Sequence, residues 1–166
     1  MNLISLIRAD DRLVHGLVAV SWSNQLQPSI LLVANDHAAN DSMSQMTMKM
    51  GKPAGVTMAI KTIDDAIKIL QNPKYANRKI FVITKNVKDA FRISQEIEDI
   101  PAVNIGTAGI EYKDEQVISV LPQIKMTEEE FDFANKLAEK NISVFAQVSP
   151  TEEKVNFVGI KKAFNK

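Results

Sequence analysis

Short apolar runs alternate with amphipathic segments along this chain. Runs rich in β-branched residues predict strands at residues 3–7, 30–34, 56–60, 80–84, 103–105 and 142–148. Between them, apolar residues recur at helical spacing within residues 63–70, 87–97 and 131–138. The pairs Thr62 with Asp65 and Thr127 with Glu130 have the spacing of helix capping boxes, which indicates where two of these helices begin.

The alternation of strands and helices predicts the α/β fold class, with a mostly parallel central sheet and helices on both faces. A chain of 166 residues, of which 45% are hydrophobic, is long enough to bury one sizeable core. We therefore expect a single domain spanning residues 1–166. Methionines crowd one helical segment, and we expect them to fill the core rather than form an adaptable partner surface. They are Met43, Met46, Met48 and Met50.

Charge and cysteine content exclude several classes of protein. Twenty basic and twenty acidic residues give a formal net charge of +0, so we expect no nucleic-acid partner held by a broad electrostatic field. The absence of cysteine excludes disulfides, thiol nucleophiles and thiolate metal sites. The N-terminal MNLISLIRADD lacks the basic start and apolar core of a signal peptide, and no later apolar run reaches the ~18 residues of a spanning helix. These features predict a soluble cytoplasmic protein.

Polar residues follow several of the predicted strands. In an open parallel sheet, ligands bind beyond the carboxyl ends of the strands, so these residues would share one rim. The segments concerned are residues 8–16; Asn35, Asp36 and His37; Thr84, Lys85 and Asn86; and Asn104, Gly106, Thr107 and Gly109.

The segment IRADDRLVHGLV places His15 just before a predicted helix with Trp22 on its buried face. The positive end of a helix dipole disfavours a protonated imidazole, and a neutral ring nitrogen is a nucleophile. Gly16 has no side chain, so a bulky group can approach the ring and the backbone closely. This arrangement is compatible with chemistry at His15.

Two arginines and two aspartates surround this histidine in the sequence. Arg8 and Arg12 carry planar guanidinium groups that match phosphate oxygens, which indicates an anion site. Asp10 and Asp11 are compatible with such a site if they neutralise the arginines, fix the tautomer of His15 or cap the following turn.

Other interpretations of the same residues remain open. A lone histidine is often structural, and a local cluster of arginine and aspartate is often a surface ion-pair network. A metal site would draw on Asp10, Asp11, His15, Asp36 and His37, but no spacing among them fixes a coordination geometry. His37 alone is typical of a solvated loop residue. The common glycine-rich nucleotide-binding motifs are missing.

The stretch IRADDRLVHGLVAVSW resembles the first strand and phosphorylation loop of a bacterial family. The family is the IIB component of the mannose/fructose/sorbose class of the phosphoenolpyruvate-dependent sugar phosphotransferase system (PTS), with the pattern R-[IV]-D-[DE]-R-L-[IV]-H-G-Q-V. Further stretches resemble the family's elements in the family's order, so the resemblance covers nearly the whole chain. They are VANDHAAND, MGKPAGV, NPKY, the NIG at residues 104–106 and the QVSP at residues 147–150.

The resemblance implies a phosphocarrier subunit, and hence a transferase with a phosphohistidine intermediate. His15 would accept a phosphoryl group on Nδ1 from a IIA component and pass it to a hexose or amino sugar entering through the IIC and IID membrane components. The protein would then be cytoplasmic and peripherally associated with those components. Arg12 and Arg8 would hold phosphoryl oxygens, Asp10 would orient, and backbone N–H groups near Gly16 would assist.

Further candidates for substrate or phosphate binding are Asp11, Thr84, Lys85 and Asn104. The resemblance implies no metal, nucleotide or other cofactor. It is compatible with a homo-oligomer, and it does not select among mannose, fructose, sorbose, glucose and N-acetylated amino sugars.

The sequence departs from the family pattern at Ala9, where isoleucine or valine is usual, and at two further places. Leu17 stands where glutamine usually follows the His-Gly pair, and Thr107-Ala108 replaces a glycine pair, with Gly109 one place on. These departures keep a rival hypothesis open, in which a non-catalytic sugar-binding or regulatory module has kept the fold. A small metal-dependent hydrolase is a third hypothesis.

Overall fold

The structure, a computed structural model, describes residues 3–112 and 116–166, with the side chains of residues 17 and 18 left aside. Its strands are β1 (Leu3–Ala9), β2 (Ile30–Ala34), β3 (Thr57–Lys61), β4 (Lys79–Thr84), β5 (Ala102–Ile105), β6 (Val117–Leu121), β7 (Ile124–Thr127), β8 (Ser143–Ala146) and β9 (Val155–Asn156). Its helices are α1 (Gly16–Leu26), α2 (Asp36–Ala39), α3 (Ser42–Met50), α4 (Ile63–Gln71), α5 (Val87–Glu96), α6 (Glu128–Glu139) and α7 (Phe157–Ala163), with a 3-10 turn at Pro73–Tyr75.

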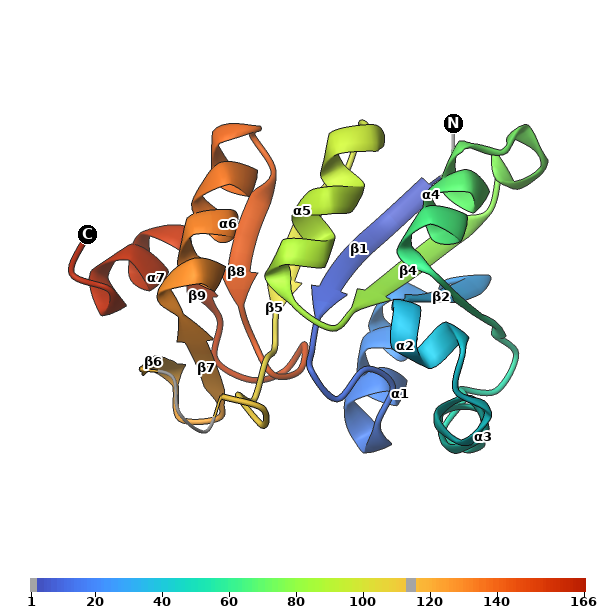
Figure 1. The fold of residues 1–166 in the computed structure, drawn as a ribbon, viewed down its shortest axis with the longest axis horizontal. Coiled ribbons are helices and arrows are strands. Elements are labelled where there is room, and N and C mark those ends of the chain that lie inside the picture. Colours follow the sequence, from blue (N-terminus) through green and yellow to red (C-terminus); the bar gives the residue numbers. More distant parts are fainter. Residues whose placement is uncertain (1–2, 113–115) are drawn as a thin grey trace.

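The central sheet has the strand order β3-β2-β4-β1-β5-β8-β9 (Figure 1). Every neighbouring pair is parallel except β8 with β9. Each predicted strand forms, so the α/β class with a mostly parallel sheet is confirmed. The antiparallel hairpin of β6 and β7 and the final β9 and α7 are additions that the sequence analysis did not predict.

Helices cover both faces of the sheet, because successive strand residues point to opposite sides. On one face α4, α5 and α6 lie side by side, and their apolar residues pack on alternate strand residues such as Ile7 and Val82 (Figure 1). On the other face, Trp22 of α1 and Met48 of α3 pack with Leu31 and Phe81. Thr62 and Thr127 accept hydrogen bonds at the starts of α4 and α6, as their spacing predicts.

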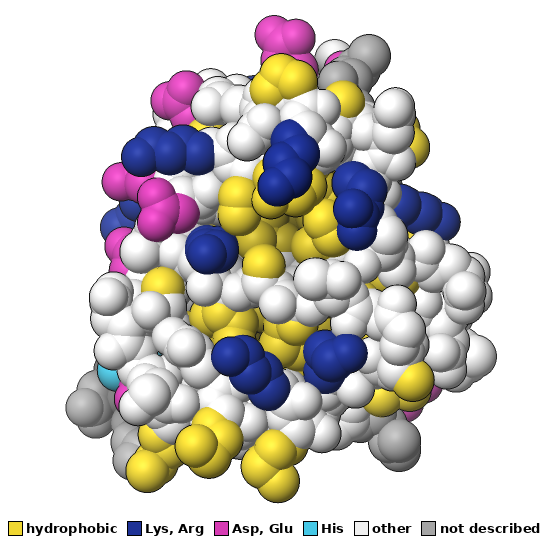
Figure 2. All heavy atoms as spheres, turned by 90° about the vertical axis from the view of Figure 1, so that its right-hand side faces the viewer, with side chains coloured by type: hydrophobic (Ala, Val, Ile, Leu, Met, Phe, Trp, Pro, Cys, Tyr) yellow, Lys and Arg dark blue, Asp and Glu magenta, His cyan; other side chains and the backbone are white. Residues whose placement is uncertain are grey.

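The expectation that the methionines fill the core is wrong for three of the four. Met48 is 4% exposed, whereas Met43, Met46 and Met50 are 75%, 67% and 85% exposed. Helix α3 lies near the β3 edge of the sheet, so one face packs inward and the outer face meets solvent. Figure 2 shows this side of the molecule, with hydrophobic side chains along its lower edge.

Parallel strands bring their carboxyl ends to one edge of the sheet. β1 lies between β4 and β5, so the loop after β1 is flanked by the loops that follow those two strands. Within residues 3–112 and 116–166, no helix is long and apolar enough to cross a membrane.

Candidate functional site

The loop between β1 and α1 is a tight turn at the carboxyl edge of the sheet. The backbone N–H of Asp10 donates to the carbonyl of Thr84 at 2.9 Å, and Leu13 N–H donates to the carbonyl of Asp10 at 2.9 Å. Gly16 opens α1 with φ +40°, a left-handed conformation that strains other residues. The turn makes His15 the N-cap residue of α1.

Asp10 is the centre of the site, with an exposure of 0%. Its Oδ2 accepts hydrogen bonds from Arg8 Nη2 at 3.0 Å, His15 Nε2 at 3.0 Å and Arg12 Nη2 at 3.2 Å. Its Oδ1 accepts from the backbone N–H of Arg12 at 2.9 Å and from Arg12 Nε at 3.0 Å. One buried carboxylate therefore joins both arginines to the histidine.

The carboxylate and the guanidinium groups of this cluster stabilise one another in their charged forms. Burial alone would raise the pKa of Asp10, but the hydrogen bond from His15, the charge of Arg8 and the hydrogen bonds from Arg12 outweigh it and lower that pKa. Burial lowers the pKa of Arg8, and the carboxylate of Asp10 opposes this effect. Asp10 is therefore an ionised carboxylate near neutral pH, and it compensates the buried cation of Arg8.

Arg8 lies beneath Asp10 rather than at the surface. The residue is 1% exposed, and its Nη1 donates to Asn104 Oδ1 and, at 3.0 Å, to the carbonyl of Gln147. Its guanidinium carbon lies 5.7 Å from the centroid of the Trp22 ring. At this position the guanidinium of Arg8 is shielded from solvent, and the expectation that it holds phosphoryl oxygens stays a prediction.

Arg12 is the arginine that reaches solvent, with a side chain 30% exposed. Besides its bonds to Asp10, its Nη2 donates to the carbonyl of Gly106 at 3.2 Å, which links the loop after β1 to the loop after β5. The guanidinium of Arg8 lies so close to the backbone at position 106 that a Cβ atom there would overlap it, so only glycine fits. Both arginines thus lie close to Gly106 and bind Asp10.

His15 has a side chain 25% exposed, and its Nε2 is committed to Asp10. Within the part of the chain that the structure describes, no hydrogen bond engages Nδ1. If Nε2 carries the proton that Asp10 accepts, the lone pair of the neutral ring lies on Nδ1. No side chain in the described residues caps α1, so His15 stands at an uncapped helix N-terminus.

Comparison with known proteins gives the family. A family profile described as "PTS system sorbose subfamily IIB component" matches residues 4–166. The chain belongs to this family of PTS IIB components.

Individual relatives agree with this family assignment. A probable phosphotransferase enzyme IIB component of Streptococcus pyogenes serotype M6 is 41% identical over 137 residues, which are 81% of this chain and 84% of the relative. The mannose-specific EIIAB component of Escherichia coli K12 is 33% identical over 63% of this chain, which spans only 32% of that longer protein. The crystal structure of the IIBSor domain of the sorbose permease from Klebsiella pneumoniae has a TM-score of 0.87 at 22% identity, over 96% of this chain and 97% of that domain. That likeness shows the fold.

Asp11 of this IIB component holds the loop after β5. Its Oδ1 accepts from Ala108 N–H at 2.7 Å and its Oδ2 from Ile110 N–H at 2.8 Å. The departure at Thr107-Ala108 is accommodated here: the Thr107 hydroxyl donates to the carbonyl of Lys125 at 2.8 Å, and Gly109 adopts φ +75°. The departure at Leu17 concerns a side chain outside the described part of the structure.

The remaining predicted residues take different places. Asn104 is buried in the network, where its Nδ2 also donates to the carbonyl of Gln147 at 3.2 Å. Thr84 is buried as well, but its hydroxyl donates to the carbonyl of Asn86 at 2.9 Å. Lys85 forms an ion pair with Glu111 at 2.8 Å and joins neither arginine. Lys85 is thus not among the residues that the fold brings together around His15.

Two members of the network were missed as site residues. Gln147 contributes its backbone carbonyl at the end of β8, and Trp22 contributes its ring, whose Nε1 donates to the carbonyl of Val148 at 3.0 Å. Every residue has a backbone carbonyl, so the residue type at position 147 does not indicate this contact. The single tryptophan was identified only as part of a buried helical face, whereas it also covers Arg8.

Metal ligation finds no support in the described residues, where no group of three or more histidines, aspartates and glutamates is arranged to hold an ion. Asp36 accepts a hydrogen bond from the backbone N–H of Ile63 at 2.9 Å. His37 has a side chain 78% exposed and lies 3.4 Å from Asp41.

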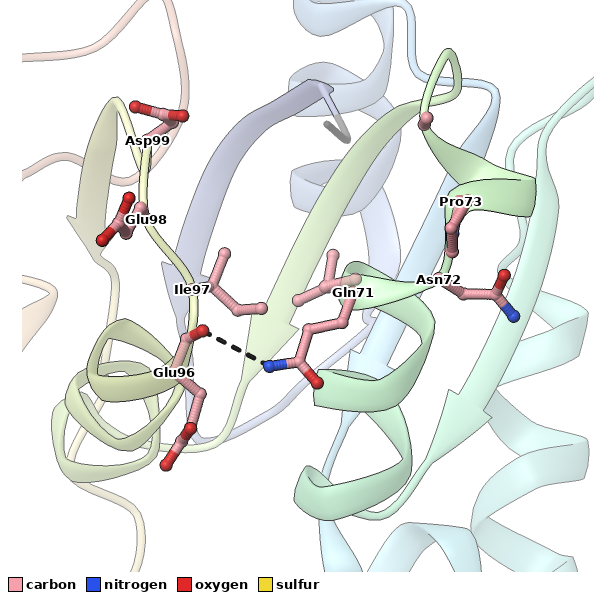
Figure 3. A pocket seen from close by; sticks show the side chains of 9 residues that line it. Gln71, Asn72, Pro73, Glu96, Ile97, Glu98 and Asp99 are labelled. Atoms are coloured by element: carbon pink, nitrogen blue, oxygen red, sulfur yellow. Dashed lines mark hydrogen bonds between the residues drawn. The ribbon is translucent and has the colours of Figure 1, made fainter.

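A separate hollow of about 450 Å³ lies between the C-terminal ends of α4 and α5 (Figure 3). Its lining includes Gln71, Asn72, Glu96, Glu98 and Asp99, and Gln71 Nε2 donates to the carbonyl of Glu96 at 3.4 Å. It lies at the amino edge of the sheet, away from His15. We therefore assign it no part in the candidate site.

Proposed function

We propose that this IIB component carries a phosphoryl group on Nδ1 of His15. It receives the group from the phosphohistidine of a IIA component and passes it to a hydroxyl of a hexose or amino sugar entering through IIC and IID membrane components. The protein works from the cytoplasm, at the membrane. The observation that carries this proposal is the hydrogen bond between His15 Nε2 and the buried Asp10, which leaves Nδ1 as the ring nitrogen available for attack.

The transfer is an in-line exchange between two imidazole rings. The lone pair of Nδ1 forms a bond to phosphorus while the bond from phosphorus to the donor nitrogen breaks, and that electron pair returns to the donor ring. The proton on His15 Nε2 stays in place, so the phosphorylated ring becomes cationic. The carboxylate of Asp10 stabilises this charge, as the aspartate of a catalytic triad stabilises its imidazolium.

The two arginines have different tasks. Arg12 reaches solvent, and its guanidinium holds the oxygens of the transferring group; one well-placed arginine can contribute about 10³-fold to such a reaction. Arg8 acts as a positioning residue, because it holds Asp10 in place through a buried ion pair of 3.0 Å. N–H groups in the first turn of α1 add further donors.

Mass spectrometry tests the proposal. Incubation with phosphoenolpyruvate, the general PTS carrier proteins and a matching IIA component adds about 80 Da of acid-labile mass to the wild type, as a phosphoryl group does. The same incubation adds none to His15→Ala, whose folding is checked by thermal unfolding. An unmodified wild type would overturn the proposal and favour a non-catalytic module.

A further inference from the structure

The loop after β5 is held by several hydrogen bonds and carries an exposed apolar side chain. Asp11 accepts the N–H groups of Ala108 and Ile110, one on each carboxylate oxygen, at 2.7 and 2.8 Å. The carbonyl of Gly106 accepts from Arg12, and Glu111 pairs with Lys85. Ile110, held in this way, is 55% exposed.

The loop that carries Ile110 lies beside the loop that carries His15, since Arg12 donates to the carbonyl of Gly106. A standard interface covers about 800 Å² on each partner, which corresponds to a disc of roughly 16 Å radius. The N–H of Ile110 donates to Asp11, and the adjacent Asp10 accepts from His15, so a short chain of contacts joins the isoleucine to the histidine. An interface of this size around His15 extends over the neighbouring loop after β5, which carries Ile110.

We propose that Ile110 is a docking contact for the phosphoryl-donor protein and that Asp11 is the positioning residue that presents it. This inference rests on the proposed function and adds a recognition surface to it. Ordering an exposed loop costs conformational entropy before binding, and a loop fixed in advance avoids that cost when the partner arrives. The occupant is a IIA-type protein with an apolar patch beside its phosphohistidine.

The geometry separates Asp11 from the chemistry. Both of its oxygens accept backbone N–H groups, so the carboxylate is already used. A free carboxylate against a phosphoryl group would also repel it, since like charges destabilise one another. Asp11 therefore acts through the loop and not on the transferring group.

The experiment measures phosphorylation of His15 by two donors, phosphorylated IIA protein and the small molecule phosphoramidate. For Ile110→Ser we expect the KM for the IIA protein to rise about tenfold, as for an apolar interface anchor, with little change in kcat. The rate with phosphoramidate stays at the wild-type value. Ile110→Leu keeps the wild-type KM. The matched control is Leu3→Ser, since Leu3 is 56% exposed at the opposite end of β1 and its replacement leaves the KM unchanged.

Asp11→Asn tests the positioning role. The asparagine amide places an NH₂ group against one of the two N–H donors, so the loop loses an anchor and the KM for the IIA protein rises. If Asp11 acts through Ile110, the double variant Asp11→Asn/Ile110→Ser has a KM close to that of Ile110→Ser alone.

Three results would overturn the inference. They are a wild-type KM in Ile110→Ser, a loss of phosphoramidate reactivity in that variant, and full additivity of the two substitutions in the KM for the IIA protein. A wild type that neither donor phosphorylates would instead overturn the proposed function itself.

Discussion

Removal of the Asp10 carboxylate is expected to destabilise the fold through Arg8. Asp10→Ala leaves a guanidinium that is 1% exposed without its counter-ion, whereas Arg12 can turn to solvent. Breaking a buried ion pair by removing one partner costs about 3–5 kcal/mol. A chain of this size loses about 2–4 °C in Tm for each kcal/mol, so the expected drop in Tm is roughly 6–20 °C.

A second substitution identifies the cause of this loss. The double variant Asp10→Ala/Arg8→Met lacks the unpaired buried guanidinium. We expect it to recover about half of the free energy of unfolding that Asp10→Ala loses. The recovery is incomplete because Asn104 Oδ1 then lacks its donor, at a cost of about 1–3 kcal/mol.

Urea unfolding of the wild type, the two single variants and the double variant gives the coupling free energy. Losses that simply add in the double variant would refute the reasoning, since they would show that Asp10 and Arg8 stabilise the fold independently.

Other substitutions give further predictions. Gly106→Ala is expected to cost about 1–3 kcal/mol in urea unfolding and to slow phosphorylation, because the new Cβ displaces the guanidinium of Arg8; unchanged values of both would contradict this packing. Arg12→Lys is expected to lower the phosphorylation rate about 10³-fold with less than about 1 kcal/mol lost in stability, and an unchanged rate would exclude Arg12 from the transfer. Burial raises the pKa of Glu130 from 4.5 to about 7, so the folded state favours the protonated form and the free energy of unfolding falls as pH rises from 4.5 to 7. Glu130→Gln is expected to remove about 3 kcal/mol of this pH dependence, and a variant that keeps it would show that another group is responsible.

The strand pattern could be predicted because it depends on local apolar runs that a parallel sheet buries on both faces. Residues 30–34 and 80–84 are buried almost throughout, and both runs were predicted as strands. The hairpin of β6 and β7 was missed although its strands are as long as β5 and β8; β6 is only half-buried and lies outside the central sheet. Exposure of the methionines was missed because spacing defines a helical face without saying whether another element covers it.

Within the site, the clustering of Asp10, Arg12 and His15 followed from their proximity in one loop. The burial of Arg8 did not follow, since it depends on the register that sets Arg8 beside Asn104 and on the carbonyl of Gln147. The role of Asp11 was equally hidden, because its partners are backbone N–H groups far along the chain. Long-range register, and not residue type, decides these contacts.

The residues of the site are far apart in the sequence and are therefore synthesised at different times. His15 is synthesised well before residue 104. Arg8, which donates to the Asp10 carboxylate, is nevertheless held by Asn104 and by the carbonyl of Gln147. A nascent chain that ends before β8 contains His15 but lacks the carbonyl of Gln147 that holds Arg8. The full set of hydrogen bonds that holds Arg8 and Asp10 can thus form only after synthesis has passed residue 147.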